Sequence, residues 1–205
     1  MNKHLFQNLN QFDLLFFIAN LIVGLCVAAL FISILINFIE SKQNGKAAKE
    51  KKSIVETGTM TLFFLAFYTL IRFDIWGLSF NNNPLRIFIV FFGLFMVILG
   101  CIINIRGRFN LGRNWANHIK IYEKQTLVRE GVYRVVRHPL YASIIWMFYG
   151  ASLIYLNLSA FLANTLIFIP FMYYRAKQEE ELLTNRFEEY KEYQTKVGMF
   201  FPNLF

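Results

Sequence analysis

The chain has 205 residues and a formal net charge of +8; 56% of its residues are hydrophobic and 17% are charged. Soluble domains contain about 45–50% apolar and about 25% charged residues, so this composition indicates a membrane protein. With only 4 Pro and 11 Gly, the chain is neither collagen-like nor disordered.

Five apolar runs predict the helices of an all-α, polytopic membrane protein. The first run is long enough to cross about 30 Å of hydrocarbon, and the third begins after a proline, which suits the first turn of a helix. Only Asn157 separates the last two runs, which predicts a tight antiparallel helical hairpin. In chain order the runs are Leu14–Ile39, Ile54–Ile71, Leu85–Ile105, Leu140–Leu156 and Leu158–Tyr174.

The basic residues predict the orientation of these helices. Of the 21 Lys and Arg residues, 18 lie in the loop 40–53, the segment 106–137 and the tail after residue 174. Five transmembrane helices place these three segments on one face, which the positive-inside rule assigns to the cytoplasm. We therefore expect a protein of the cytoplasmic membrane with its N-terminus outside and its C-terminus inside. Topology and anionic membrane lipids then explain the charge, and nucleic-acid binding is not expected.

Polar residues divide the chain into two parts. Residues 1–105 contain little polar material and are expected to form a three-span scaffold. Residues 106–205 are expected to form the chemical core, with a cytoplasmic segment, the helical hairpin and a C-terminal helix. The lysine-rich loop 41–52 is interpreted as a solvated connector.

The first polar cluster lies where the fourth run begins. Proline restricts the residue before it and favours the first helical position, so His138 is predicted to cap a helix that starts at Pro139. The free backbone N–H groups of Leu140 and Tyr141 would then suit a carboxylate or a phosphate. The alternative is that His138 is only an interfacial cap and that the two preceding arginines reach lipid headgroups.

The second polar cluster, Arg175–Leu183, continues the fifth run. Arg175 and Glu179 share a helix face, and Glu180 is turned away by about 100°. Alone, this segment could be a solvated helix with one ion pair. However, the hairpin returns the end of the fifth run to the membrane face where the fourth begins. The two clusters are therefore expected to form a charged, aromatic-lined site at the cytoplasmic surface.

The sequence contains no motif for several common kinds of nucleotide, metal or nucleophilic site. The chain lacks a Gly-x-Gly-x-x-Gly fingerprint and a P-loop, which argues against dinucleotide and P-loop nucleotide binding. Its three histidines form no His-x-x-x-His pair, and its cysteines, Cys26 and Cys101, form no zinc-binding pattern, so no metal site is expected. Ser143 has no triad partners around it.

The ordered polar motifs resemble the isoprenylcysteine carboxyl methyltransferase family and its phospholipid methyltransferase relatives. The family pattern reads Leu-Gly-x-x-Trp, His-x-Leu-Val-x-x-Gly-x-Tyr, Arg-His-Pro-x-Tyr, then Arg, paired Glu and Phe-Gly-x-x-Tyr-x-x-Tyr. Gln125 stands where the family often has His, and no Gly follows Phe187. The matching residues are Leu111, Gly112, Trp115, Leu127, Val128, Gly131, Tyr133, Arg137, His138, Pro139, Tyr141, Arg175, Glu179, Glu180, Phe187, Tyr190 and Tyr193.

This resemblance implies an integral-membrane methyltransferase that uses S-adenosylmethionine without a Rossmann domain. The acceptor would be lipophilic and enter from the bilayer, and the carboxylate of a prenylated cysteine is the foremost candidate. The resemblance assigns catalysis to Arg175 and Glu180, with Arg175 facing the acceptor. His118 is a further candidate cofactor contact. The cofactor-binding positions by resemblance are Gln125, Leu127, Val128, Tyr133, His138, Pro139, Tyr141, Glu179 and Glu180.

The residue types suit this chemistry. Methyl transfer from a sulfonium needs mainly proximity and alignment, which contribute up to about 7–11 kcal/mol. A carboxylate acceptor needs a cation to position it and no general base. The alternatives are a phospholipid N-methyltransferase, an NADPH-dependent relative of the sterol reductases with a similar Arg-His-Pro-x-Tyr hairpin, and a non-catalytic membrane scaffold. A transporter subunit is disfavoured because Leu14–Ile39, Leu85–Ile105 and the hairpin hold no ionisable side chain at mid-depth.

Overall fold

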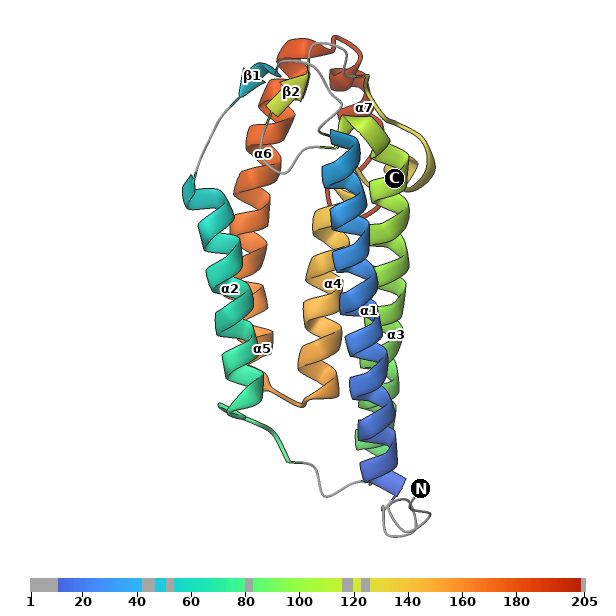
Figure 1. Ribbon diagram of the computed structural model, residues 1–205, viewed down its shortest axis with the longest axis vertical. Coiled ribbons are helices and arrows are strands. Elements are labelled where there is room, and N and C mark those ends of the chain that lie inside the picture. Colours follow the sequence, from blue (N-terminus) through green and yellow to red (C-terminus); the bar gives the residue numbers. More distant parts are fainter. Residues whose placement is uncertain are drawn as a thin grey trace.

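A computed structural model of the chain describes residues 11–41, 47–50, 54–79, 83–115, 120–122 and 126–203. Helices contain the five predicted apolar runs, apart from Tyr155 and Leu156 at the end of the fourth run (Figure 1). The helices are α1 (Gln11–Ser41), α2 (Ile54–Arg72), α3 (Asn83–Leu111), α4 (Pro139–Ile154), α5 (Leu158–Ala163), α6 (Ile169–Arg186) and α7 (Tyr190–Lys196). Two 3₁₀ turns, η2 (Gly112–Asn114) and η3 (Gly131–Arg134), and two short strands, β1 (Ala47–Glu50) and β2 (Lys120–Tyr122), complete the described elements.

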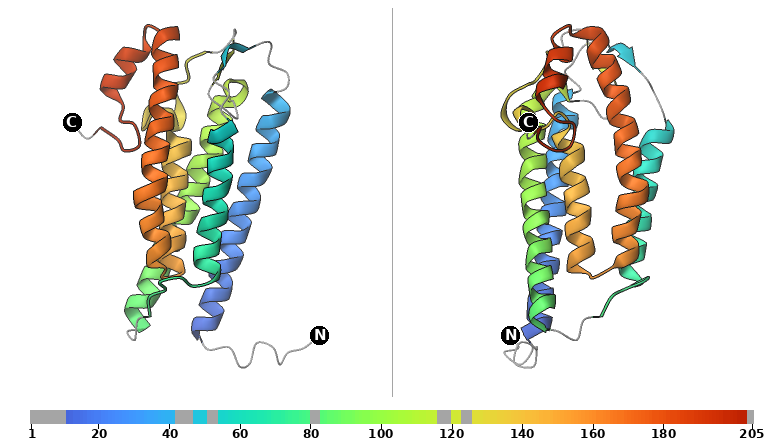
Figure 2. Two further views of the ribbon diagram at one scale, coloured as in Figure 1. Left: turned by 90° about the vertical axis from the view of Figure 1, so that its left-hand side faces the viewer. Right: turned by 180° about the vertical axis from the view of Figure 1, so that it is seen from behind.

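The long helices run side by side in two groups. Helices α1, α3 and α4 pack together, and α2 lies beside the rod formed by α5 and α6 (Figures 1 and 2). Glycine allows α3 and α4 to approach closely. A Cβ atom on Gly93 would lie 2.6 Å from the carbonyl oxygen of Gly150, and one on Gly100 would lie 2.9 Å from that of Ser143. Larger residues at these two glycines would push the helices apart.

Aromatic side chains fill the interior between α2, α4 and α6. The ring of Phe63 stacks on that of Phe168 at 4.6 Å between centroids, and Phe148 meets Phe168 edge-on at 4.8 Å. The outer surface is also apolar, with large exposed side chains such as Phe31, Leu62 and Phe88. Such a surface is unusual for a protein in water and suits contact with lipid.

Two helical segments, Asp13–Ile39 and Pro84–Asn114, are long and apolar enough to cross a membrane. Two further apolar helices, Gly58–Arg72 and Pro139–Ile154, are shorter. The helix that begins at Asn83 continues to Leu111, beyond the apolar run that ends at Ile105. Its final turns therefore carry polar residues into the region that the sequence assigned to a separate core.

The chain reverses between α4 and α5 at Asn157. The buried Asn157 caps α5 by accepting a hydrogen bond from Ala160 N at 2.8 Å. Its Nδ2 also donates to the carbonyl oxygens of Leu70 at 3.2 Å and Ile75 at 3.0 Å. This one side chain thus ties the reversal to the end of α2 and to the loop after it.

Two local features differ from the sequence interpretation. The strand β1, inside the loop interpreted as a solvated connector, pairs with β2 in an antiparallel ribbon. A π-helical turn, Asn164–Phe168, interrupts the last long helix between α5 and α6. Pro170 lacks the N–H that an α-helix would use at that position, which explains the wider turn just before it.

Candidate functional site

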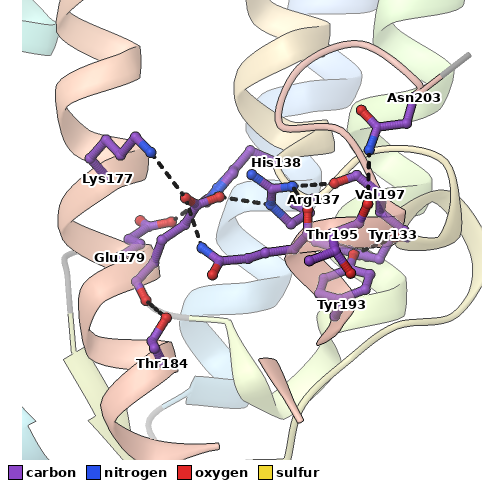
Figure 3. A network of polar contacts seen from close by, with 12 residues as sticks. Tyr133, Arg137, His138, Lys177, Glu179, Thr184, Tyr193, Thr195, Val197 and Asn203 are labelled. Atoms are coloured by element: carbon purple, nitrogen blue, oxygen red, sulfur yellow. Dashed lines mark hydrogen bonds and ion pairs between the residues drawn. The ribbon is translucent and has the colours of Figure 1, made fainter. Parts of the chain in front are cut away.

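The candidate site lies at the end of the bundle where α4 begins and α6 extends beyond the apolar core. Figure 3 shows side chains from the residues just before α4, from α6 and from the C-terminal segment converging there. The predicted meeting of the two polar clusters is therefore present in the structure. It brings together His138, Pro139 and Tyr141 of the first cluster with Arg175, Glu179 and Glu180 of the second.

His138 is the N-cap residue of α4, as the His-Pro pair predicted, and Pro139 occupies the first turn. The side chain of His138 makes no capping hydrogen bond, so the imidazole is directed to other partners. Its backbone N–H donates to the carbonyl oxygen of Met199 at 3.0 Å, and that of Arg137 donates to Gly198 at 2.8 Å. The C-terminal segment thereby covers the start of α4.

The imidazole of His138 is buried between two carboxylates of α6. Its Nε2 lies 3.2 Å from Glu180 Oε1, and its Nδ1 lies 3.5 Å from Glu179 Oε2. The ring also lies parallel to that of Tyr141, with centroids 5.6 Å apart. Carboxylates at both ring nitrogens favour the doubly protonated imidazolium, because each nitrogen can then donate a hydrogen bond.

The charges of this cluster shift the acidities of its members. Burial lowers the pKa of His138, but hydrogen bonds with Glu179 and Glu180 outweigh that effect and raise it above the ordinary 6.5. Burial raises the pKa of Glu180, but hydrogen bonds from His138 and Arg137 lower it from 4.5 to about 2. Both shifts favour the charged forms of the two side chains.

Arg137 is a member of the site that the sequence placed in the Arg-His-Pro-x-Tyr motif but not among the predicted catalytic or cofactor-binding residues. Its Nε donates to Glu180 Oε1 at 2.8 Å, and its Nη1 donates to the carbonyl oxygens of Gln194, at 2.9 Å, and of Val197 (Figure 3). Gln194 adds a hydrogen bond from Nε2 to Glu180 Oε2 at 3.1 Å. The position of Arg137 next to His138 could have indicated that it belongs to the site. Its hydrogen bonds to carbonyl oxygens of the C-terminal segment could be seen only in the tertiary structure.

Tyr141 connects the acidic pair to Arg175. Its hydroxyl donates a hydrogen bond to Glu179, and the guanidinium carbon of Arg175 lies 5.9 Å from the centre of its ring. Arg175 is only 5% exposed, and its Nη1 lies 3.2 Å from the sulfur of Met60 on α2. The predicted substrate residue is therefore buried between helices α2, α4 and α6.

Of the remaining predicted cofactor positions, some are described by the structure and others are not. Tyr133 is buried in η3, and its carbonyl oxygen accepts a hydrogen bond from the hydroxyl of Tyr193. Leu127 and Val128 are half-buried in the segment before η3. Gln125 and His118 lie outside the described residues.

The family glycine that is missing after Phe187 is not needed by this backbone. Phe187 ends α6 in an extended conformation, and Tyr190 and Tyr193 are buried in α7. Among the described residues other than glycine, a positive φ occurs at Asp74, Trp76 and Leu156, and not at Glu188.

Within the described part of the chain, no group of three or more His, Cys, Asp or Glu side chains could hold a metal ion.

Comparisons with known proteins agree with the motifs. Residues 92–185 match the model of the isoprenylcysteine carboxyl methyltransferase (ICMT) family. A probable protein-S-isoprenylcysteine O-methyltransferase of Oryza sativa subsp. indica is 36% identical over 118 residues, which are 56% of this chain and 62% of that protein. Protein-S-isoprenylcysteine O-methyltransferase B of Arabidopsis thaliana is 34% identical over 109 residues, covering 52% of this chain and 55% of that protein.

The corresponding enzyme of Saccharomyces cerevisiae is 30% identical over 115 residues, covering 51% of this chain and 48% of that protein. The chain thus spans about half to three fifths of the length of these curated relatives. A solved structure of the eukaryotic intramembrane Ras methyltransferase ICMT shares the fold, with a TM-score of 0.54 and 23% sequence identity over 74% of this chain and 54% of that one.

The shared fold and the long apolar helices identify an integral membrane protein. The matched region contains α4, most of α6 and every residue of the His138–Glu179–Glu180 cluster. The resemblance found in the sequence motifs is therefore confirmed: residues 92–185 of this chain match the model of the ICMT family.

Proposed function

We propose that this protein is an S-adenosylmethionine-dependent methyltransferase that esterifies the carboxylate of a prenylated cysteine or a closely similar lipophilic acceptor. The observation that carries this proposal is the meeting of His138 with Glu179 and Glu180, 3.2–3.5 Å apart, inside the region that matches the ICMT family. The curated relatives are named as enzymes that methylate isoprenylcysteine, which gives the acceptor class.

The residues at the site suit the cofactor. Glu179 is 30% exposed beside the buried His138, so one carboxylate remains accessible to the cationic or hydroxyl groups of S-adenosylmethionine. The aromatic ring of Tyr141 and the half-buried Leu127 and Val128 offer apolar contact. When bound, the cofactor supplies an activated methyl group on its sulfonium. By resemblance, the cofactor-binding set is Gln125, Leu127, Val128, Tyr133, His138, Pro139, Tyr141, Glu179 and Glu180.

We assign Arg175 to the acceptor and Glu180 to the electrostatics of the reacting centre. The guanidinium of Arg175 can hold both oxygens of a carboxylate in one plane, which orients the nucleophile for an in-line displacement. Glu180 is held ionised by Arg137 and His138, so it offers a fixed negative charge near the cationic cofactor. The apolar exterior of the helices would admit a lipid chain from the bilayer.

We further propose five transmembrane segments with the N-terminus outside and the site at the cytoplasmic face of the cytoplasmic membrane, because 18 of the 21 basic residues then face inward. Residues 1–105 would form the scaffold and residues 106–205 the catalytic core. Reporter fusions after Lys52, Asn82, Lys124 and Asn203 test this topology. Fusions at Asn82 and Lys124 that report the same side contradict it.

The activity is tested with purified protein in lipid nanodiscs, methyl-labelled S-adenosylmethionine and N-acetyl-S-farnesylcysteine. We expect label in a base-labile methyl ester, and none when the carboxylate of the acceptor is already esterified. E180Q, which keeps the size of the side chain, serves as the inactive control. Label that appears in phosphatidylethanolamine instead, or no transfer by a folded protein, overturns the proposed acceptor.

A further inference from the structure

A buried arginine outside the sequence-predicted site has an unsatisfied donor. Arg108 lies near the end of α3, and its side chain is only 8% exposed. Its Nε donates to Asn104 Oδ1 at 2.9 Å, but its Nη1 is buried and has no hydrogen-bond partner among the described residues. No carboxylate in the described part of the chain pairs with this guanidinium. A buried cation normally has a counter-ion, because removing its charge from water is costly.

Arg108 is anchored against the first turn of α4. Asn104, which holds Nε of Arg108, donates from Nδ2 to Leu140 O at 3.1 Å and to Ser143 Oγ at 2.8 Å. A Cβ atom on the intervening Gly107 would lie 2.9 Å from the side chain of Leu140. The guanidinium is therefore held at the end of the helix pair where α4 begins.

The surroundings of Arg108 include the segment that the family resemblance assigns to the cofactor. Its guanidinium carbon lies 5.6 Å from the centre of the Trp115 ring. The preceding residue, Asn114, exchanges hydrogen bonds of 3.0 and 3.1 Å with Thr126, which adjoins Leu127. A Cβ atom on Gly107, next to Arg108, would lie 3.6 Å from Cγ2 of Val132, the residue before Tyr133.

The described surroundings of Arg108 stabilise its charge but do not accept all of its hydrogen bonds. The stacking on Trp115 and the carbonyl end of α3 both favour a positive charge, but neither accepts the N–H groups of Nη1. His138 and Arg137, the neighbouring basic residues at the start of α4, are already engaged by Glu179 and Glu180. A ligand carboxylate would give Arg108 both a charge partner and a hydrogen-bond acceptor.

We propose that Arg108 binds the carboxylate of the amino-acid end of S-adenosylmethionine. This inference rests on the proposed function, because it names the residue that would fix one end of the cofactor. The acceptor carboxylate is assigned elsewhere, since Arg175 lies beside Met60 of α2 and the ring of Tyr141. Arg108 would thus bind the carboxylate of the cofactor, and Arg175 would bind the carboxylate of the acceptor.

The test compares S-adenosylmethionine with decarboxylated S-adenosylmethionine, which lacks only the carboxylate. Affinities are measured by calorimetry on the full chain in nanodiscs, for the wild type, R108M and R108K. R106M is the matched control, because Arg106 lies two residues earlier on the same helix and is exposed. The thermal midpoint of each protein is measured with and without ligand.

The wild type and R106M should prefer the carboxylated cofactor by about tenfold or more, which is typical of one charged hydrogen bond. R108M should bind both ligands equally, with an unliganded thermal midpoint no lower than that of the wild type, because methionine removes an unpaired buried charge. R108K should keep only part of the preference, since lysine lacks the planar fork.

An R108M protein that keeps the full preference for the carboxylated cofactor overturns the assignment of Arg108. If R108M fails to fold, the assignment is overturned by an R108K protein that prefers the carboxylated cofactor as strongly as the wild type does. A folded wild type that binds neither ligand would instead refute the proposed function. The two failures are therefore distinguishable.

Discussion

His138 Nε2 lies 3.2 Å from Glu180 Oε1, although 42 residues separate them along the chain. The contact joins the first residue before α4 to the part of α6 that extends beyond the apolar core. Arg137 reaches the same carboxylate oxygen at 2.8 Å, so Glu180 is the common partner of two basic neighbours. The polar end of the bundle is organised around this one carboxylate.

The stability of the protein should depend on pH through this contact. The pKa of Glu180 is lowered to about 2, so its stabilising contribution is present above pH 4.5 and is lost as pH falls toward 2. The pKa of His138 is raised, so its contribution is complete below pH 6.5 and is lost as pH rises through the higher folded-state pKa. The thermal midpoint should therefore be highest between about pH 4.5 and 6.5, as far as these two groups determine it.

E180Q tests the acidic limb of this profile. The variant should have a lower thermal midpoint at pH 5–6, and a smaller decline below pH 4.5 than the wild type. E192Q is the control, because Glu192 is exposed and pairs with Lys196 on its own helix, at 2.6 Å. Parallel acid declines in E180Q and the wild type would show that other carboxylates control the acid sensitivity.

Arg137→Lys should loosen the C-terminal segment. Lysine can retain the charge opposite Glu180 but cannot also serve the carbonyl oxygens of Gln194 and Val197 in the same geometry. We expect faster amide hydrogen exchange in residues 194–203 and a loss of about 1.5–3 kcal/mol of stability. R134K is the matched control because Arg134 is exposed. Equal exchange in both variants would mean that the other tail contacts suffice.

Arg175→Lys should reduce turnover with little effect on cofactor affinity. The lost planar contact to the acceptor carboxylate should lower kcat by about 10- to 100-fold, on the order of 1.4–2.7 kcal/mol in the barrier. The measurement is single-turnover methyl transfer together with calorimetric binding of S-adenosylmethionine. K191M, at an exposed position of α7, controls for loss of positive charge. Wild-type turnover by both R175K and R175M would make Arg175 a structural anchor only.

Asn157→Ala should destabilise the turn between α4 and α5. The change removes the cap of α5 and leaves the carbonyl oxygens of Leu70 and Ile75 without their side-chain donor. We expect a loss of roughly 2–4 kcal/mol. S159A should cost less, because Ser159 contributes only its hydroxyl bonds to Ile75 O and Asn157 Oδ1. Equal melting of N157A and the wild type would show that the helices alone define the reversal.

The sequence by itself determined where the helices lie and that the two polar clusters meet at one end of the bundle. In lipid, a long apolar run can satisfy its backbone hydrogen bonds within itself only as a helix, and the proline after His138 defines where α4 begins. Because a single residue separates the last two runs, they had to be antiparallel, which brought His138 and Glu180 to one end. These inferences depend on local chemistry and chain connectivity.

Only the tertiary structure decided which groups share the hydrogen bonds of the site. The carbonyl oxygens of Gln194 and Val197 reach Arg137 from the C-terminal segment, and no residue type marks a backbone carbonyl as a partner. The pairing of β1 with β2 likewise joins segments about 70 residues apart. The unsatisfied donor of Arg108 also became visible only when α3 was found to continue to Leu111 against α4. Burial and the absence of a partner are properties of packing, so local sequence patterns cannot specify them.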